Sequence, residues 1–328
     1  MLINKQQKIF VAGHKGMAGS AIIRTLRRKK YTNIVTVDKS DLDLTQFKEV
    51  ESWFEINNPD IVILCAAKVG GILANNTYPT EYLLENLKIQ NNVIENSWKF
   101  GVKRLLFLGS SCIYPKYANQ PIKEEYLLSG ILEKTNEAYA LAKIAGIKLC
   151  QALRRQYSFD AISIMPTNLY GPGDNFHSHD SHVLPALIRK FCDAKEKNLP
   201  CVTCWGTGNV MREFLHVDDL GDAAIFCLEK WDVNSKNAPK DSSNEPLTHL
   251  NVGTGKDITI KDLVKLIAYA TKYNGEIIWD HEKPDGTPKK QLNTEKITQL
   301  GWKPTIDLKN GIIRTVEYFK ENRDQLRL

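Results

Sequence analysis

Short apolar runs and longer amphipathic segments alternate through the first half of the chain. Five runs rich in Val, Ile, Leu and Phe cover residues 8–13, 33–38, 60–67, 104–111 and 161–168. Between them, apolar residues recur every three or four positions, as in amphipathic helices, over 20–30, 47–57, 80–101 and 137–157. Strands that alternate with helices in this way predict a parallel sheet covered on both faces. We therefore expect an α/β fold with a Rossmann-type, doubly wound parallel sheet.

The second half of the chain is less regular and predicts a smaller α/β C-terminal lobe. Its patterns indicate helices at 182–196 and 308–322, a strand entering a helix within 212–231, and one strand followed by a helix that begins near Thr259. We expect a nucleotide-binding domain at 1–170 with a return segment at about 212–256, and a substrate lobe at 171–211 and 257–328.

Composition and charge are those of an ordinary soluble protein, with 42% hydrophobic and 25% charged residues. The formal net charge is +6, and the only dense basic cluster is RTLRRKK at 24–30. That cluster shares an amphipathic segment with Ile22, Ile23 and Leu26, so it predicts a solvated helix face. We expect no nucleic-acid partner, whereas an anionic small substrate fits the charge.

The N-terminal sequence MLINKQQK lacks the apolar run and cleavage site of a signal peptide, and no apolar stretch approaches membrane-spanning length. Seven scattered cysteines, an odd number, argue against a disulfide framework and favour a reducing compartment. Cys201 and Cys204 have CxxC spacing, but thiols three apart on a strand point to opposite faces. We therefore expect a cytoplasmic protein without membrane or metal sites.

GHKGMAG, which follows the first predicted strand and opens a helix, carries the first candidate chemistry. Gly13 allows a tight turn, Gly16 lets backbone N–H groups approach a pyrophosphate, and Gly19 allows close helix packing. The intervening side chains of this candidate dinucleotide loop are His14, Lys15, Met17 and Ala18.

The end of the second predicted strand leaves the cofactor's phosphate state open. Asp38 stands where a carboxylate would accept hydrogen bonds from the adenosine ribose, which favours NAD. The adjacent Lys39 would equally pair with the 2′-phosphate of NADP, and both residues would also be ordinary in a solvated turn.

EAYALAK places Tyr139 and Lys143 four residues apart, on one face of a helix. Ser110, at the end of the fourth predicted strand, would converge with them at the same edge of the sheet. Reduction of a carbonyl needs a proton donor, and a phenol serves best when a nearby ammonium lowers its pKa. We expect Tyr139 to be the acid, Lys143 its electrostatic partner and ribose anchor, and Ser110 the group that positions the carbonyl.

Together these motifs resemble the extended short-chain dehydrogenase/reductase family acting on nucleotide sugars. REFLHVDD is similar to the family's signature for gripping a nucleotide diphosphate. AAKVGGILANNTYP, LGSSCIYP, MPTNLYGPGDNFH, SHVLPALIR and KPDGTP extend the resemblance almost end to end, within the branch that acts on GDP-4-keto sugars. The resemblance implies NADPH-dependent conversion of GDP-4-keto-6-deoxy-D-mannose to GDP-L-fucose, by epimerisation at C3 and C5 followed by reduction at C4.

The resemblance also implies two proton-transfer groups. In dehydratases of the family a Thr-Asp-Glu run occupies the slots that here hold Ser110, Ser111 and Cys112, so a thiol takes the acid/base position. The resemblance pairs Cys112 with His182, which would be the opposing acid. Without the resemblance, Cys112 would be interpreted as an ordinary packed cysteine and His182 as a surface residue. His177 and His179 keep the interpretation of surface residues.

Further roles follow only from the resemblance. It implies cofactor contacts from Leu108, Gly109, Ser110, Ser111, Lys143, Pro166, Thr167, Asn168, Leu169 and His182. It implies contacts to the GDP-sugar from Lys190, Trp205, Arg212 and Asp285, although Arg is commoner than Lys at position 190. It implies a homodimer built on helices within 80–100 and 137–157.

Two alternatives stay open. One is a related GDP-hexose or GDP-heptose epimerase or 4-reductase, because sugar identity depends on small differences in the pocket. The other is a cofactor-sensing regulator on an inactive reductase scaffold, against which the intact Tyr139 and Lys143 pair argues.

Overall fold

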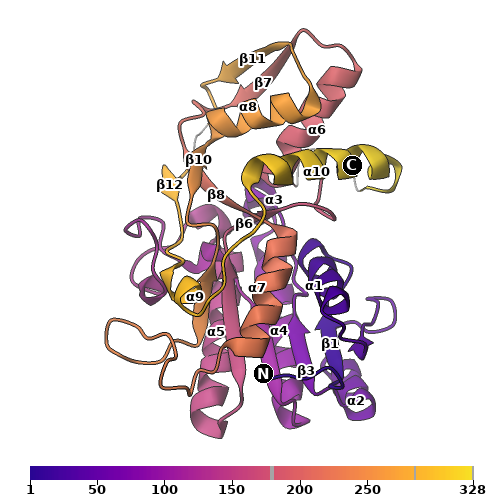
Figure 1. Ribbon diagram of the computed structural model, residues 1–328, viewed down its shortest axis with the longest axis vertical. Helices are drawn as coiled ribbons and strands as arrows, with labels where there is room; N and C mark the ends of the chain where they lie inside the picture. The colour runs from indigo at the N-terminus through magenta and orange to yellow at the C-terminus, as the bar shows by residue number, and fades with distance from the viewer. Residues whose placement is uncertain (178–180, 284–285, 327–328) are drawn as a thin grey trace.

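Six parallel strands form the central sheet of the larger lobe, in the order β2-β1-β3-β4-β5-β9 (Figure 1). The computed structural model describes residues 1–177, 181–283 and 286–326. The strands are β1 Ile9–Ala12, β2 Ile34–Val35, β3 Ile61–Leu64, β4 Arg104–Leu108, β5 Ala161–Pro166 and β9 His249–Val252. The strand order reverses between β1 and β3, and ligands of such sheets bind outside the carboxyl ends of the strands at that point. The predicted fold class is confirmed.

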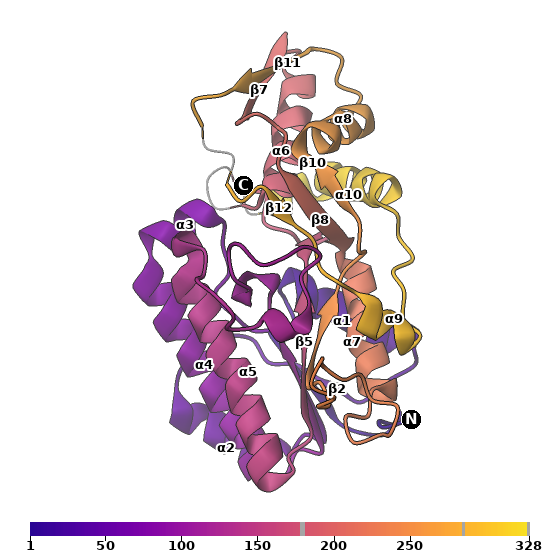
Figure 2. The ribbon, with the colours of Figure 1, turned by 90° about the vertical axis from the view of Figure 1, so that its left-hand side faces the viewer.

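Helices cover both faces of this sheet, as Figure 2 shows. On one face lie α1 Met17–Arg28 and α7 Val217–Lys230, and on the other α2 Phe47–Asn57, α4 Pro79–Lys99 and α5 Glu137–Tyr157. Side chains alternate along each strand, so Ile9 and Val11 pack in the first layer while Phe10 and Ala12 pack in the second. Burial on both faces is the reason that these strands read as continuous apolar runs.

The smaller lobe has its own core, which includes Phe176, Phe191 and Phe319. Its strands are β6 Asn168–Tyr170, β8 Met211–His216, β10 Asp257–Thr259 and β12 Lys289–Lys290, with the separate parallel pair β7 Cys201–Trp205 and β11 Glu276–Asp280. Its helices are α6 Val183–Glu196, α8 Ile260–Thr271 and α10 Leu308–Asn322. The short elements are α3 Ile72–Thr77, α9 Glu295–Gln299, η1 Ser111–Ile113, η2 Glu124–Tyr126, η3 Lys134–Asn136 and η4 Arg323–Gln325.

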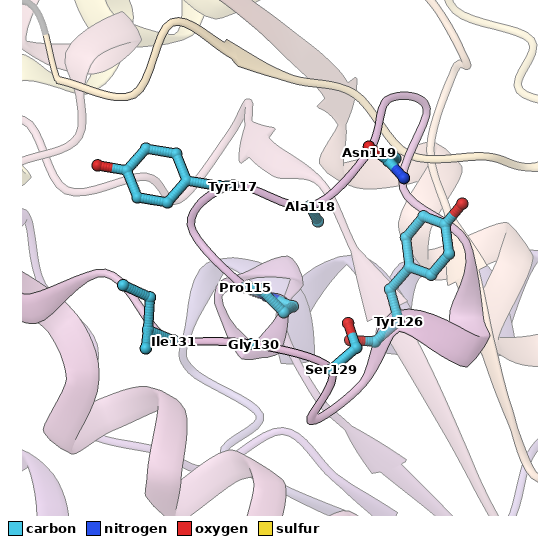
Figure 3. A pocket seen from close by; sticks show the side chains of 8 residues that line it. All are labelled: Pro115, Tyr117, Ala118, Asn119, Tyr126, Ser129, Gly130 and Ile131. Atoms are coloured by element: carbon cyan, nitrogen blue, oxygen red, sulfur yellow. The ribbon is translucent and has the colours of Figure 1, made fainter.

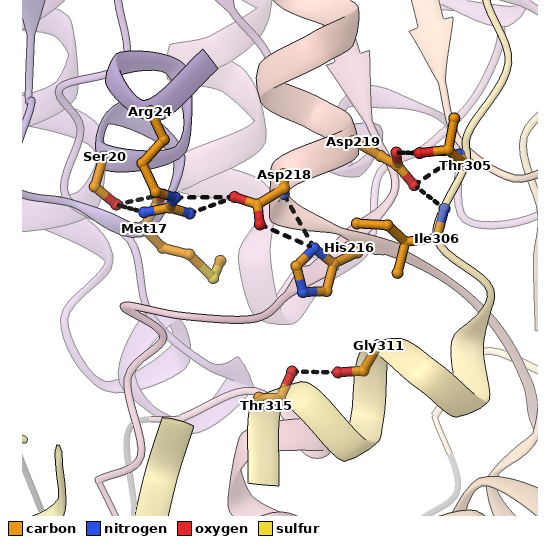
Figure 4. Close-up of polar contacts among 10 residues, drawn as sticks. All are labelled: Met17, Ser20, Arg24, His216, Asp218, Asp219, Thr305, Ile306, Gly311 and Thr315. Atoms are coloured by element: carbon orange, nitrogen blue, oxygen red, sulfur yellow. Dashed lines mark hydrogen bonds and ion pairs between the residues drawn. The ribbon is translucent and has the colours of Figure 1, made fainter. Parts of the chain in front are cut away.

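The first turn of α7 joins the two lobes through polar contacts (Figure 4). Arg24 of α1 donates two hydrogen bonds, of 3.0 and 2.5 Å, to Asp218 Oδ1. The Asp218 N–H donates to Nδ1 of the buried His216, which ends β8. Asp219 accepts hydrogen bonds from the backbone N–H groups of Thr305 and Ile306, ahead of α10. These bonds fix α1, β8 and α10 relative to one another.

Most predicted helices appear within three residues of their expected bounds, and three strand predictions need correction. The strand expected at 33–38 is only Ile34–Val35, because it is an edge strand that pairs with β1 over two residues. The strand expected at 161–168 divides into β5 and β6, because the chain leaves the first sheet after Pro166 to pair with β8. The single strand expected after residue 250 is two strands, β9 and β10, separated by a turn in which Gly255 has φ +66°.

The described residues contain neither a membrane-spanning helix nor a metal-binding cluster. None of their helices is long and apolar enough to cross a membrane. No group of three or more His, Cys, Asp or Glu side chains among them could hold a metal ion.

Candidate active site

The glycine loop lies at the point where the strand order reverses. A Cβ on Gly13, which has φ +85°, would lie 2.6 Å from the backbone nitrogen of Ala66, just after β3. A Cβ on Gly19 would lie 2.2 Å from the Gly13 carbonyl oxygen. Gly16 meets neither restriction: it has φ −72°, and its nearest neighbour would be 3.4 Å away. Gly13 and Gly19 are therefore needed by the fold, whereas Gly16 leaves the surface of the loop open to a ligand.

The N-terminus of α1 is suited to an anion. The N-cap Gly16 offers no side-chain hydrogen bond, and the first turn, which includes Met17 and Ala18, contains no acidic residue. The N–H groups at a helix N-terminus and the helix dipole favour negative charge. The loop thus fits the pyrophosphate of a dinucleotide.

Asp38 is held by the glycine loop itself. Lys15 Nζ lies 2.6 Å from one carboxylate oxygen and His14 Nε2 lies 3.2 Å from the other. The hydrogen bond from Lys15 is the main cause that lowers the pKa of Asp38. Both oxygens of Asp38 are engaged by His14 and Lys15, and Lys39 is exposed beside them, so cations offset the negative charge of this corner. The residues fit NADP better than Asp38 alone suggested.

The turn after β4 brings a hydroxyl and a thiol together. Ser110 Oγ donates to Cys112 Sγ at 3.1 Å and accepts a hydrogen bond from the Cys112 N–H at 3.2 Å. Ser110 is the N-cap of the 3₁₀ turn η1, which explains its orientation. Cys112 stays partly accessible, in contrast to the buried Ser111.

Tyr139 and Lys143 project from α5 toward this turn. Contrary to the expected lowering by Lys143, burial raises the pKa of the Tyr139 phenol, the nearby Cys112 raises it further, and a hydrogen bond with Ser110 opposes the shift. Lys143, only 3% exposed, donates to the Leu108 carbonyl oxygen at 2.9 Å, and burial lowers its pKa to about 8. The structure therefore brings Ser110, Cys112, Tyr139 and Lys143 into one site.

Two neighbours of this site were not predicted. Ala74, Tyr82 and Tyr139 form one apolar cluster, against which Cys112 packs. Cys65, just after β3, is close enough to Lys143 for the two groups to interact electrostatically, and burial raises the pKa of this thiol to about 12. Cys65 lies near the end of a predicted strand, which is a weak indication of a place in the site. The sequence around Tyr82 shows only helical periodicity, which does not indicate a site residue.

The other residues expected near the cofactor line the same edge of the sheet. A Cβ on Gly109 would lie 2.3 Å from Met165 Sδ, so any larger residue there would require the Met165 side chain to move. Thr167 and Asn168 side chains donate to the Glu213 carbonyl oxygen at 3.2 and 2.8 Å. These two side chains therefore connect the junction of β5 and β6 to β8, and Pro166 and Leu169 flank them at the crossing between the lobes.

The residues expected to bind the GDP-sugar lie on the smaller lobe. His182 is the N-cap of α6, and desolvation together with the charge of Lys290 lowers its pKa. Arg212, on β8, pairs in register with Lys290 of β12 and donates to the Met211 carbonyl oxygen at 2.8 Å.

Lys190 and Trp205 are two further residues expected to bind the GDP-sugar. Lys190 donates to the Thr203 carbonyl oxygen, and Trp205 is 68% exposed with Lys283 Nζ 5.7 Å from its ring centroid. Lys283 was not predicted. The predictions for Asp285 and His179 lie outside the described residues, whereas His177 is described and partly buried.

A cavity of about 490 Å³ opens beside the segment that connects Cys112 to Tyr139 (Figure 3). Its lining comes from that segment alone: Pro115, Tyr117, Ala118, Asn119, Tyr126, Ser129, Gly130 and Ile131. None of the predicted site residues lines this cavity, so it is separate from the candidate active site.

Comparison with known proteins gives consistent matches. Residues 9–244 match the model of the NAD dependent epimerase/dehydratase family. The chain is 53% identical over 321 residues to the putative GDP-L-fucose synthase 2 of Arabidopsis thaliana, covering 98% of this chain and 94% of that protein.

Solved structures agree with that match. A GDP-6-OMe-4-keto-L-xylo-heptose reductase from C. jejuni is 37% identical with a TM-score of 0.89, covering 98% of this chain and 99% of the other. A GDP-L-fucose synthetase from Naegleria fowleri bound to NADP is 26% identical with a TM-score of 0.87, covering 100% and 98%.

Proposed function

The chain belongs to the NAD dependent epimerase/dehydratase family, and from that premise we propose that it is the enzyme that converts GDP-4-keto-6-deoxy-D-mannose to GDP-L-fucose with NADPH. The reaction inverts C3 and C5, the carbons on either side of the C4 ketone, and then reduces that ketone. The relative from Arabidopsis thaliana, at 53% identity, bears the name of this activity.

The observation that carries the proposal is the Ser110–Cys112 hydrogen bond of 3.1 Å beside buried Tyr139 and Lys143. A reductase alone needs only the hydroxyl, the phenol and the ammonium. A partly accessible thiol in the same place adds a group that exchanges protons readily, as an epimerase requires.

For the reduction, Ser110 and Tyr139 bind the C4 carbonyl oxygen and Tyr139 gives it a proton. Lys143 is cationic below its pKa of about 8 and stabilises the phenolate that Tyr139 leaves behind. NADPH, when bound, supplies the hydride to C4. The glycine loop from Gly13 to Gly19 and the cations Lys15 and Lys39 are the residues suited to hold it.

For the epimerisation, a proton leaves each carbon from one face and returns on the other. Cys112 and His182 are the two groups that exchange it, and the lowered pKa of His182 favours the neutral imidazole, which can accept a proton. The same hydrogen bonds from Ser110 and Tyr139 stabilise the enolate oxygen, so one site serves both steps.

We further propose a division of labour between the lobes. Residues 1–170 with 212–256 hold NADPH, with contacts from Leu108, Gly109, Ser111 and the 166–169 segment, while residues 171–211 and 257–328 hold the GDP-sugar. Lys190 and Arg212 offer cations to the diphosphate, and the exposed ring of Trp205 offers a face for stacking.

The test uses the purified protein with NADPH and GDP-4-keto-6-deoxy-D-mannose. GDP-L-fucose should form with stoichiometric NADPH oxidation, and solvent deuterium should appear at C3 and C5. Cys112→Ser should lose that exchange while NADPH still binds, whereas Cys201→Ser, a partly buried thiol in β7, should behave as the wild type. Absence of NADPH oxidation at high enzyme concentration refutes the proposed function, and unchanged exchange in Cys112→Ser removes the thiol from it.

A GDP-heptose 4-reductase is the closest competing activity. The C. jejuni heptose reductase is 37% identical to this chain, against 53% for the Arabidopsis thaliana relative. A tenfold preference in kcat/KM for a GDP-heptose over the 6-deoxyhexose substrate would decide for it, equivalent to about 1.4 kcal/mol.

Two properties complete the proposal. The exposed Leu84 on α4 and Leu141 on α5 lie on the adjacent helices expected to form a homodimer, which light scattering of the purified protein would test. All seven cysteines are free, which suits a protein that works in the reducing cytoplasm.

A further inference from the structure

Tyr82 is a residue without an assigned role that packs beside the proposed catalytic groups. Its ring, only 5% exposed, shares a cluster with Ala74 and Tyr139, and Cys112 packs against that cluster. The ring reaches this place from α4, a helix that contributes none of the predicted site residues. Tyr82 therefore touches the surroundings of both the proposed acid and the proposed thiol.

The tip of Tyr82 presses against the loop that follows β3. A Cβ added to Gly70 would lie 2.1 Å from the Tyr82 hydroxyl oxygen and 3.1 Å from the ring carbon that bears it. The hydroxyl thus occupies the space that any other residue at position 70 would need. This close approach explains why a glycine stands there although its backbone does not require one.

The loop that meets Tyr82 is itself held rigidly. Asn86, one turn further along α4, accepts a hydrogen bond from the Lys68 N–H at 2.9 Å and donates to the Lys68 carbonyl oxygen at 3.0 Å. Asn75 Nδ2 donates to the carbonyl oxygens of Gly70 and Gly71, at 2.8 and 2.9 Å. Asn86 of α4 thus holds the loop just before Gly70, and Asn75 of α3 holds it at Gly70 and Gly71, so Tyr82 meets a loop that is fixed at both points.

We propose that Tyr82 is a positioning residue: its ring, packed between the loop at Gly70 and the cluster with Ala74 and Tyr139, holds Tyr139 and Cys112 in their reactive arrangement. This inference rests on the proposed function, since it concerns the same site. A displaced ring would let Tyr139 and Cys112 move away from Ser110, and a misplacement of about 1 Å costs about 100-fold in rate.

The contact suggests a rescue experiment. Gly70→Ala places a methyl group on the Tyr82 oxygen and should lower kcat for NADPH oxidation, and solvent deuterium exchange, by about 100-fold, with little change in KM. Tyr82→Phe removes that oxygen but keeps the ring, and should lower kcat less than Gly70→Ala does. The double variant should regain at least about tenfold over Gly70→Ala, because the remaining 3.1 Å contact needs only a small shift.

Tyr78→Phe is the matched control, because Tyr78 lies at the start of the same helix with an exposed side chain. Combined with Gly70→Ala it should restore nothing. The proposal is overturned if Gly70→Ala retains activity within about threefold of the wild type, or if Tyr82→Phe fails to rescue it.

A second variant covers the case in which Gly70→Ala does not fold. Tyr82→Leu removes the ring and should lower kcat at least about tenfold, and a wild-type kcat in that variant overturns the proposal. Failure of the proposed function is distinguishable from failure here, because an inactive wild-type enzyme refutes the former, whereas an active wild type with no rescue refutes only the latter.

Discussion

Replacement of the buried Lys143 by Met should make the cofactor-free protein more stable near pH 7 while it abolishes ketone reduction. Burial lowers the pKa of Lys143 from 10.5 to about 8, so the folded state holds this proton less tightly than the unfolded chain. Met has a similar length, carries no charge and packs well in apolar surroundings. The variant removes the charge without leaving a large cavity.

The magnitude follows from the shift. At 1.36 kcal/mol per pKa unit, the charged form costs about 3 kcal/mol of unfolding free energy at all pH values below 8. Loss of the 2.9 Å hydrogen bond to the Leu108 carbonyl oxygen offsets about 1 kcal/mol of the gain. The net expectation is a stabilisation of about 2 kcal/mol near pH 7.

The sign of the pH dependence is fixed by the lowered pKa. Between pH 8 and 10.5 the unfolded chain binds more protons at this site than the folded protein, so wild-type stability rises with pH there. By about pH 9.5 the remaining charge penalty is about 1 kcal/mol, which the lost hydrogen bond cancels. The advantage of Lys143→Met should therefore vanish at about that pH.

Urea unfolding of the apo protein near pH 7 and pH 9.5 measures both values. Lys148→Met, an exposed lysine on the same helix, is the matched control and should show no such pH dependence. A Lys143→Met variant that is less stable than the wild type near pH 7, or equally more stable at both pH values, would refute this reasoning.

Three further predictions concern the fold and the cofactor. Glu213→Gln should lower the unfolding free energy by about 2–4 kcal/mol in urea titrations. The buried Glu213 carboxylate accepts hydrogen bonds from the backbone N–H groups of Thr254, Gly255 and Leu292 at 2.6–2.8 Å, and an amide NH₂ would face one of these donors. The exposed control Glu245→Gln should change the unfolding free energy by less than about 0.5 kcal/mol. Gly16→Ala should fold normally but weaken NADPH binding in fluorescence titrations, whereas Gly19→Ala should destabilise the protein itself; equal effects of the two on stability contradict the assignment. Lys39→Ala should raise the Kd for NADPH more than that for NADH, and a uniform loss excludes contact with the 2′-phosphate.

The fold was largely predictable because its determinants are local. The helices at 47–57, 137–157 and 308–322 appear with the expected bounds, since each shows apolar periodicity and a clear start and stop. The short edge strand β2 and the divided β5 and β6 were not, because the length of a strand depends on what pairs with it. No local pattern states that pairing.

The candidate site divides in the same way. The Tyr139–Lys143 spacing and the strand-end position of Ser110 and Cys112 follow from neighbouring residues, and the structure brings these four together. The engagement of Asp38 by His14 and Lys15 joins residues about 24 positions apart and was not foreseen. Nor was the contact of Tyr82 with Gly70, which depends on how α4 crosses the loop after β3.

The amino-acid sequence by itself determined the alternation of strands and helices, the glycine loop and the types of group present in the site. Periodicity and turn chemistry are properties of adjacent residues, so they are visible in the chain. Only the tertiary structure decided that Lys143 is buried, that Asp38 is paired with His14 and Lys15, and that Tyr82 packs beside Tyr139 and Cys112. Desolvation and packing depend on atoms brought together from distant segments, and those set the pKa values and positions on which the chemistry relies.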